Sequence, residues 1–208
     1  MQRLAVARLR SFGAGRISTE AHRAGRLKNM SEAEELEGLG PQNHVALELA
    51  MAEYDKGDPK RIHHFVKIRT FARDIAEAEG IDAKTRYIVE AAAIVHDAGI
   101  HESERIYGNA SGKHQEELGP GVARPLLEKA EYAPEAIERI CWLIAHHHTY
   151  ANIEGADYQI LVEADFLVNI YEDAPDNAEA RRHAAEQAKR HIFRTQTGTK
   201  LLELLYLS

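Results

Sequence analysis

The stretch IVEAAAIVHD (residues 88–97) ends an apolar helical segment on a histidine that is followed directly by an aspartate. Nine of the chain's 12 histidines lie between His44 and His148, and Asp165 follows on the most hydrophobic stretch of the sequence. Imidazole and carboxylate groups bind divalent metals of intermediate hardness. Placing them on apolar helices lowers stability unless a partner, most simply a metal ion, satisfies them. The pattern therefore predicts a metal centre inside a helical bundle.

Composition places the chain among soluble proteins, with a length that fits one large domain or a small domain plus appendages. It has 208 residues, of which 44% are hydrophobic and 28% are charged. The net charge of −7 argues against general nucleic-acid binding, but it permits a small phosphorylated ligand held by a few local cations. The single cysteine, Cys141, excludes an internal disulfide and favours a reducing cytoplasm. No apolar run is long enough to span a bilayer, so we expect a cytoplasmic protein that does not bind membranes.

The first 29 residues carry seven arginines and lysines against one acid, Glu20. Such a leader is compatible with a transit peptide, with a disordered basic arm, or with translation from upstream of a true start at Met30. We expect residues 1–43 to form an N-terminal arm of this kind and residues 44–208 to form the folded domain.

Helix-compatible segments follow one another with short breaks, and no alternating β-branched run competes with them. The fold class is therefore predicted to be all-α. Asp82 is expected to cap one helix and Thr197 the last one. Residues 104–113 are expected to form the only long loop of small residues. Helices are predicted near residues 44–56, 59–79, 83–98, 114–130, 134–148, 158–173, 177–193 and 197–207.

Helical spacing separates inward-facing from outward-facing histidines. His64 lies on the same helical stripe as Ile68, Phe71 and Ile75, whereas its neighbour His63 lies on a polar face. A single inward histidine is commonly a hydrogen-bonded core residue, so His64 is a candidate ligand mainly because of the other histidines.

Two further histidine motifs end helical segments. An aspartate such as Asp97 is unfavourable at the negative end of a helix dipole, which favours a metal ligand over a simple capping pair at positions 96 and 97. In the run His146-His147-His148, spacing predicts that His147 and His148 face inward and that His146 is peripheral. A triple histidine can also be an ordinary polar helix end.

Asp165 lies in a segment, residues 160–170, that is apolar on every side. An ionised carboxylate in such a buried helix is costly unless it binds a cation or strong hydrogen-bond donors. The alternative to a metal is a buried salt bridge to an arginine or lysine. Asn169, one turn later, is positioned to contact the same site.

The order His64, His96-Asp97, His147/His148, Asp165 resembles the H…HD…H…D arrangement of the HD-domain superfamily of metal-dependent phosphohydrolases. The segments RIHHFVKI (61–68), AIVHDAGI (93–100) and ADFL (164–167) are similar to that family's motif segments. Residues 111–169 resemble a bacterial subgroup whose substrate is generally unassigned. The resemblance covers roughly residues 44–207 and implies an HD-type helical bundle with the metal site at its centre.

The resemblance also implies which residues would bind metal. His64, His96, Asp97 and Asp165 would hold a first divalent ion, and His147 or His148 would complete a second site in two-metal members. A further ligand in such members comes from a helix between these motifs, where His114 is slightly displaced from the expected position and Glu116 and Glu117 compete with it. One or two ions are therefore expected, chosen among Mn²⁺, Fe²⁺, Ni²⁺, Co²⁺ and Mg²⁺.

The activity implied is hydrolysis of a phosphoester, either a nucleotide or another small phosphorylated metabolite. Asp97 would orient or deprotonate the attacking water. Lys113, after a flexible loop, and Arg61 are the candidate cations for the phosphate. A non-catalytic nucleotide-binding or regulatory module and a di-iron oxygenase are the alternatives. The leucine-rich C-terminal segment leaves a monomer and a homodimer both open.

Overall fold

The structure is a computed structural model, and it describes residue 34 and residues 36–208. Glu35–Ser208 forms one compact unit. Most of the predicted arm lies outside the described residues. The described part contains helices and no strand, which confirms the all-α fold class. The helices are α2 (Val45–Tyr54), α3 (Pro59–Ala78), α4 (Ala83–Val95), α5 (Ile100–Tyr107), α6 (Gly112–Lys129), α7 (Pro134–Ile144), α8 (Ala156–Glu172), α9 (Ala178–His191), α10 (Gln196–Leu202) and the short π-helix η1 (Glu203–Leu207).

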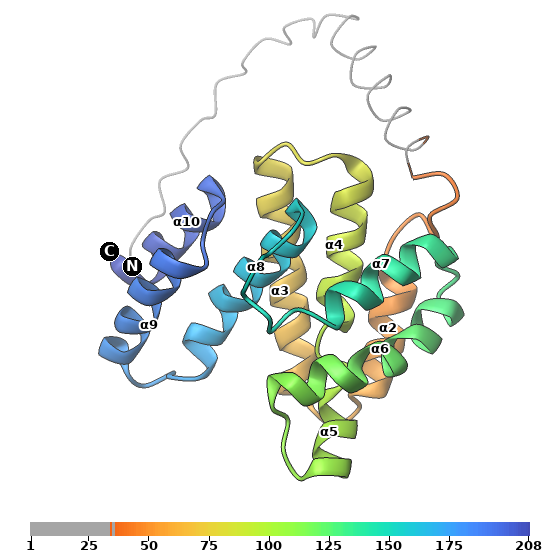
Figure 1. Ribbon diagram of the computed structural model, residues 1–208, viewed down its shortest axis with the longest axis horizontal. Coiled ribbons are helices and arrows are strands. Elements are labelled where there is room, and N and C mark those ends of the chain that lie inside the picture. Colours follow the sequence, from red (N-terminus) through yellow and green to blue (C-terminus); the bar gives the residue numbers. More distant parts are fainter. Residues whose placement is uncertain (1–33, 35) are drawn as a thin grey trace, which may run out of the picture. The chain divides into compact units, whose positions relative to one another are not determined.

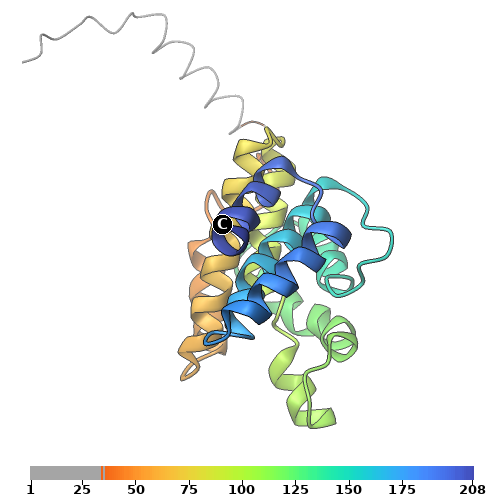
Figure 2. The ribbon, with the colours of Figure 1, turned by 90° about the vertical axis from the view of Figure 1, so that its left-hand side faces the viewer.

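Helices α3, α4 and α8 form the centre of the unit. Helix α3 packs against both α4 and α8, and α4 also packs against α8 and α7 (Figures 1 and 2). Burial of Ile88 through Val95 and of Ile160 through Asp165 shows that α4 and α8 are enclosed over long stretches. The prediction that the segment around Asp165 is a buried helix is therefore confirmed.

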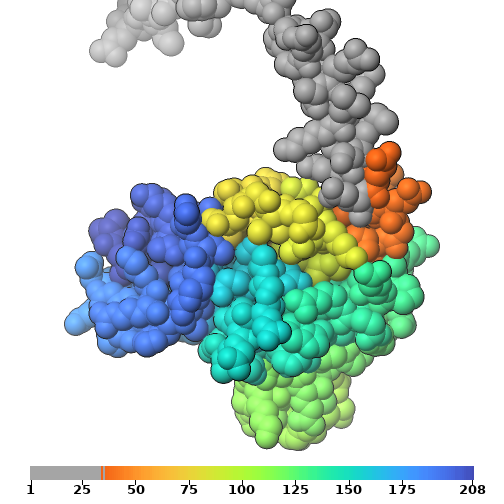
Figure 3. Space-filling view, turned by 45° about the horizontal axis from the view of Figure 1, so that its top comes forward, coloured from red at the N-terminus to blue at the C-terminus, as the bar shows by residue number. Residues whose placement is uncertain are grey.

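The other helices surround this centre in two groups. Helix α6 contacts α5 and α7, while α9, α10 and η1 contact one another and join α8 through α9 and α10. On the face shown in Figure 3, the blue C-terminal helices and the green to teal α6 and α7 lie on opposite sides. The metal-ligand candidates come from α3, from α8 and from the turns that follow α4 and α7.

Several local predictions are confirmed and others need correction. Asp82 caps α4 by accepting a hydrogen bond from the backbone N–H of Thr85 (2.9 Å). The last cap is Thr195, not Thr197, because the Thr195 hydroxyl accepts from the Gly198 N–H (2.9 Å). Residues 104–113 are not one loop, since α5 continues through Tyr107.

Two helices that lead into the candidate site end three or four residues earlier than predicted. Helix α4 stops at Val95 and α7 at Ile144, so His96 and the histidine run lie on turns that follow them. The apolar periodicity continues past both ends, which explains why the sequence predicted longer helices.

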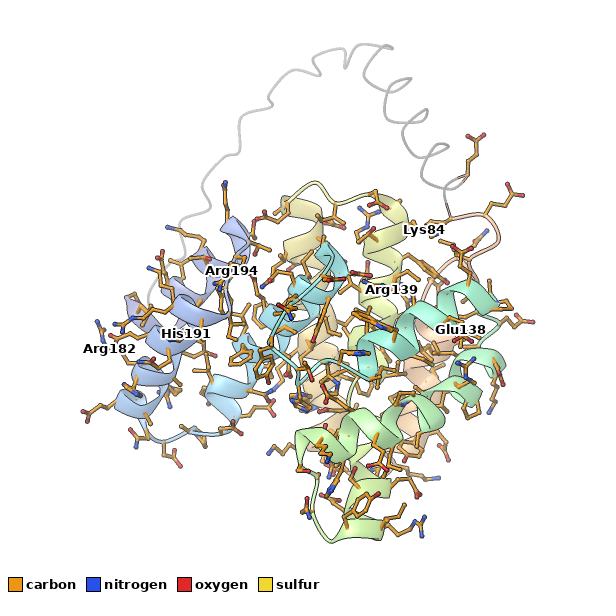
Figure 4. The ribbon with its side chains drawn as sticks, viewed as in Figure 1. Lys84, Glu138, Arg139, Arg182, His191 and Arg194 are labelled. Atoms are coloured by element: carbon orange, nitrogen blue, oxygen red, sulfur yellow. The ribbon has the colours of Figure 1, made fainter. Side chains whose placement is uncertain are left out.

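Polar contacts hold the start and the middle of α8. Arg139 on α7 donates to both carboxylate oxygens of Asp157, each at 2.7 Å (Figure 4). In the middle of the helix, the buried carboxylate of Glu163 accepts hydrogen bonds from the backbone N–H groups of Arg194 (2.6 Å) and Thr195 (2.9 Å). Glu163 therefore joins α8 to the segment between α9 and α10.

Candidate metal centre

His64 reaches the centre from the buried face of α3. Its ring is 7% exposed, while the adjacent His63 is exposed as predicted. The Nδ1 atom lies 3.1 Å from Glu172 Oε2, and the other oxygen of Glu172 pairs with Lys67. This contact leaves Nε2 of His64 directed toward the cluster.

His96 and Asp97 lie on the turn between α4 and α5. The His96 Nδ1 donates to the carbonyl oxygen of Ala93 (2.9 Å). The turn lies against α6, because a Cβ atom on Gly99 would stand 2.8 Å from the backbone nitrogen of Gly119 and 2.9 Å from the Gln115 oxygen. Glycine at position 99 thus allows the turn to lie directly on the α6 backbone.

His147 repeats the arrangement of His96 at the end of α7. Its Nδ1 donates to the carbonyl oxygen of Ile144 (2.7 Å), and the ring is 1% exposed. His148 is half-buried, with Nε2 3.3 Å from Gln115 Oε1, and its pKa is lowered to about 4, mainly by burial. His146 is turned away and stacks on Trp142, as the peripheral position predicted.

Asp165 enters from the middle of α8. Its Oδ1 atom lies 3.6 Å from the Nε2 atoms of both His64 and His96, and it accepts a hydrogen bond from Asn169 Nδ2 (2.8 Å). The charged partners of this carboxylate are thus imidazoles, and the arginine or lysine salt bridge considered from the sequence is not what surrounds it.

The candidate ligands converge as two groups joined by Asp97. Ligand atoms of His64, His96 and Asp165 lie within 4.8 Å of one another, and so do those of Asp97, His147 and His148. Asp97 faces both groups, since its Oδ2 is 3.2 Å from His64 Nε2 and 3.4 Å from His96 Nε2, while its Oδ1 is 3.7 Å from His147 Nε2. The arrangement offers ligands for one ion and a bridging carboxylate for a second.

The hydrogen bonds of the imidazoles fit a cation. In His64, His96 and His147 the Nδ1 atom contacts an oxygen acceptor, so the N–H is placed on Nδ1 and the lone pair on Nε2. The three Nε2 atoms are buried and lack a hydrogen-bond partner within the described residues. Buried nitrogen atoms without a partner are costly, and a metal ion would satisfy all three.

The charges in the cluster also favour a cation. Burial lowers the pKa of His64, but the neighbouring carboxylates of Asp165 and Asp97 outweigh it and raise that pKa to about 9. Burial opposes ionisation of Asp97, yet the charge of His96 and the nearby rings of His147 and His64 hold its pKa well below the usual range. The pKa of Asp165 is lowered by its contacts with His64 and His96. The two carboxylates therefore stay ionised and stabilise positive charge beside them, either protonated imidazoles or a metal ion.

A half-open cavity of about 260 Å³ leads to the cluster. Its described lining includes the candidate ligands His64, Asp97 and His148, together with Asn169 and Gln115. The remaining lining residues are Asp58, Lys60, Arg61, Ile100, Glu172 and Asp173.

Three of the predicted residues lie away from the ligand groups. His114 stacks on Tyr107 with ring centroids 3.9 Å apart, and its Nδ1 contacts Asn109. Glu116 accepts from the backbone N–H of His148 (3.0 Å) and so holds the turn rather than facing the cluster. Lys113 is exposed and does not line the cavity, whereas Arg61 does.

Sequence reasoning missed Glu172, Gln115 and the rim residues of the cavity. Glu172 follows Asp165 and Asn169 on one face of α8, at steps of four and three residues, so helical spacing from Asp165 would have identified it. Gln115 carried no signal, because the chemistry of a lone glutamine is not distinctive.

No helix within the described part of the chain is both long and apolar enough to cross a membrane. Comparison of the chain with protein-family models, with curated proteins and with solved structures found no match.

Proposed function

We propose that the cluster is a divalent-metal centre of an HD-type phosphohydrolase and that it hydrolyses a small phosphoester. The observation that carries the proposal is a set of three buried Nε2 atoms around Asp97, those of His64, His96 and His147. None of them has a hydrogen-bond partner among the residues that the structure describes. Imidazoles with a defined tautomer beside carboxylates are suited to hold such an ion.

A bound divalent ion would polarise a phosphoryl oxygen and lower the pKa of a coordinated water. In the proposed reaction the water oxygen forms a bond to phosphorus, and the bond from phosphorus to the ester oxygen breaks. Asp97 lines the cavity and accepts the proton of the attacking water, which then passes to the departing oxygen. The products are an alcohol and inorganic phosphate.

Arg61 is the proposed phosphate-binding residue. Its Nε donates to Asp58 Oδ2 and its Nη2 to Glu104 Oε1, both at 3.0 Å. These bonds hold the guanidinium at the cavity and leave Nη1 without a partner within the described residues. Lys60 lines the cavity beside it. Lys113, the other candidate from the sequence, has no place in this proposal because it lies outside the cavity lining.

The test combines metal analysis with a hydrolysis screen. Protein purified without chelators is analysed for bound metals, loaded in turn with Mn²⁺, Fe²⁺, Ni²⁺, Co²⁺ and Mg²⁺, and assayed on phosphomonoesters, phosphodiesters and nucleotides. We expect stoichiometric metal and release of inorganic phosphate. Absence of turnover from every phosphoester in fully loaded protein would overturn the proposal.

Two neighbouring histidines provide a matched comparison. His64→Gln should lose bound metal and activity, whereas His63→Gln, which changes an exposed residue of the same helix, should keep both. Asp97→Asn should abolish phosphate release. Nucleotide binding that persists in Asp97→Asn when no variant turns over would instead indicate a binding module. A paramagnetic signal from partly oxidised, iron-loaded protein would indicate an oxygenase.

A further inference from the structure

The wall of the cavity is unusually polar for a site that binds a nucleobase. Of the described residues that line it, Ile100 alone is apolar and none is a phenylalanine, tyrosine or tryptophan. Nucleobases are held by stacking on aromatic or apolar surfaces, and ligand pockets are in general lined mostly by such side chains. Tyr150, which lies beside His148, is not part of the lining and meets Phe166 edge to face. The flat groups that do line the cavity are the imidazoles of His64 and His148, which belong to the two ligand groups, and the guanidinium of Arg61. Among the described lining residues, no further aromatic or broad apolar surface is left on which a base would stack.

The charge of the wall argues against a polyphosphate. Four carboxylates line the cavity, those of Asp58, Asp97, Glu172 and Asp173, against the two cations Lys60 and Arg61. Arg61 is already paired with Asp58 and with Glu104. A triphosphate would bring several negative charges to a rim where carboxylates exceed cations, whereas one phosphate can be met by the metal centre and Arg61.

Two acceptor groups of the wall remain free to bind hydroxyl groups. Asn169 uses its Nδ2 on Asp165, and its Oδ1 has no partner among the described residues. Asp173, at the end of α8, lines the cavity with a carboxylate that forms no ion pair or hydrogen bond within the described part of the chain. Hydroxyl groups donate to such acceptors, and ionised acceptors make the stronger bonds.

We propose that the substrate is a phosphomonoester of a small, hydroxyl-rich compound, a sugar or polyol phosphate, and not a nucleotide. This inference rests on the proposed phosphohydrolase function and specifies its substrate class. Arg61 and the metal centre receive the phosphate, and Asn169 Oδ1 and Asp173 receive the hydroxyl groups. A cavity of about 260 Å³ lies just below the usual range for small-molecule sites, which suits a compound of this size.

Ribose 5-phosphate and AMP provide the decisive comparison, because they differ by the base alone. ATP and AMP then differ by two phosphates. We expect kcat/KM for ribose 5-phosphate to equal or exceed that for AMP, and ATP to be the poorest of the three. A site that stacks the base gains about 1–3 kcal/mol from it, which corresponds to roughly 5- to 150-fold in favour of AMP. A preference for AMP above about tenfold would overturn the inference.

The role of Asp173 has its own matched pair of variants. Asp173→Ala should raise KM for ribose 5-phosphate by about tenfold or more, the loss expected for one hydrogen bond to a charged group. The KM for p-nitrophenyl phosphate, which has no hydroxyl groups to bind, should not rise, because Asp173→Ala removes a negative charge from the wall and no contact to this substrate. The control Asp176→Ala changes an exposed aspartate that does not line the cavity and should behave as the parent protein. Equal effects of Asp173→Ala on both substrates would contradict the assignment.

The two proposals fail in distinguishable ways. If p-nitrophenyl phosphate and AMP are hydrolysed but sugar and polyol phosphates are not, the substrate class is wrong and the phosphohydrolase function stands. If no phosphoester is hydrolysed, the proposed function is wrong. Calorimetric titration of the metal-loaded protein with ribose 5-phosphate and with AMP then still decides which compound the cavity prefers.

Discussion

Replacing Glu172 tests whether His64 binds metal, without touching any candidate ligand. Glu172 Oε2 lies 3.1 Å from His64 Nδ1, and its side chain is 11% exposed. A carboxylate in this position fixes the tautomer and the orientation of the ring and increases the basicity of the opposite nitrogen. If Nε2 of His64 binds the ion, loss of Glu172 must weaken metal binding.

The size of the effect follows from the contacts of Glu172. Removing a residue that orients a metal-bound histidine lowers metal affinity by about 10- to 100-fold, which is about 1.4–2.7 kcal/mol. Glu172→Gln keeps an acceptor oxygen and loses only the charge, so we expect the lower end of this range. Glu172→Ala removes the acceptor and also frees Lys67, which pairs with Glu172, so we expect the upper end.

The assay is competition for Mn²⁺ or Co²⁺ against a fluorescent chelator, followed by calorimetry. Glu135→Gln is the matched control, because Glu135 also pairs with a lysine, Lys84, but at an exposed position outside the cluster. It should bind metal as the parent protein does. Affinities within twofold of the parent protein for both Glu172 variants would refute the assignment of His64 as a ligand.

Three further results are expected. Gly99→Ala should lower the free energy of unfolding by about 1–3 kcal/mol in urea titrations, because the new Cβ would meet the backbone of Gly119 at 2.8 Å. The control Gly121→Ala changes a glycine on α6, the helix that contains Gly119. Its new Cβ would have no atom within 4 Å, so it should raise the free energy of unfolding by about 0.5–1 kcal/mol. Burial, followed by the charge on Arg69, lowers the pKa of His44 from 6.5 to about 3. Between these two values the unfolded chain binds more protons than the folded chain, so stability falls as the pH falls below 6.5. His44→Gln should therefore lose about 2 kcal/mol less than the parent protein between pH 6.5 and pH 5. Metal affinity should rise with pH toward 9, with proton release in calorimetry, because the metal-free cluster holds a proton on His64 up to a pKa of about 9.

Each of these results can fail clearly. Equal unfolding free energies for the two glycine variants would mean that the turn after α4 adjusts freely. A parallel pH dependence of stability for His44→Gln and the parent protein would remove His44 as the source of acid sensitivity. Metal affinity independent of pH between 6 and 9 would contradict a protonated cluster in the metal-free state.

The fold class and the burial of α8 could be predicted because both depend on local periodicity. The continuous apolar text around Asp165 indicates a helix enclosed on all sides, and the structure has one there. The ends of α4 and α7 could not be predicted, since apolar residues continue up to His96 and His146 and the sequence contains no strong stop signal before them.

For the candidate site, the types of residue in the sequence identified the candidate ligands, but the sequence did not reveal which residues would surround them in the folded chain. The sequence singled out the histidines and aspartates of the two ligand groups, which the fold brings together. It could not tell that Glu116 would hold the turn after α7 or that Lys113 would lie outside the cavity, because both outcomes depend on how α6 packs. The sequence also did not indicate that Asp58 and Asp173 would line the cavity, because they belong to segments that meet only in the folded chain.

The residues at which α4 and α7 end determine how substitutions on the following turns would affect the candidate metal centre. The carbonyl oxygens of Ala93 and Ile144 would accept backbone N–H groups if their helices continued, and instead they accept the ring N–H of His96 and His147. The positions at which α4 and α7 end therefore determine the tautomers of His96 and His147. A substitution on either turn that extends the helix would release the ring above it and inactivate the centre while leaving every ligand residue in the sequence unchanged.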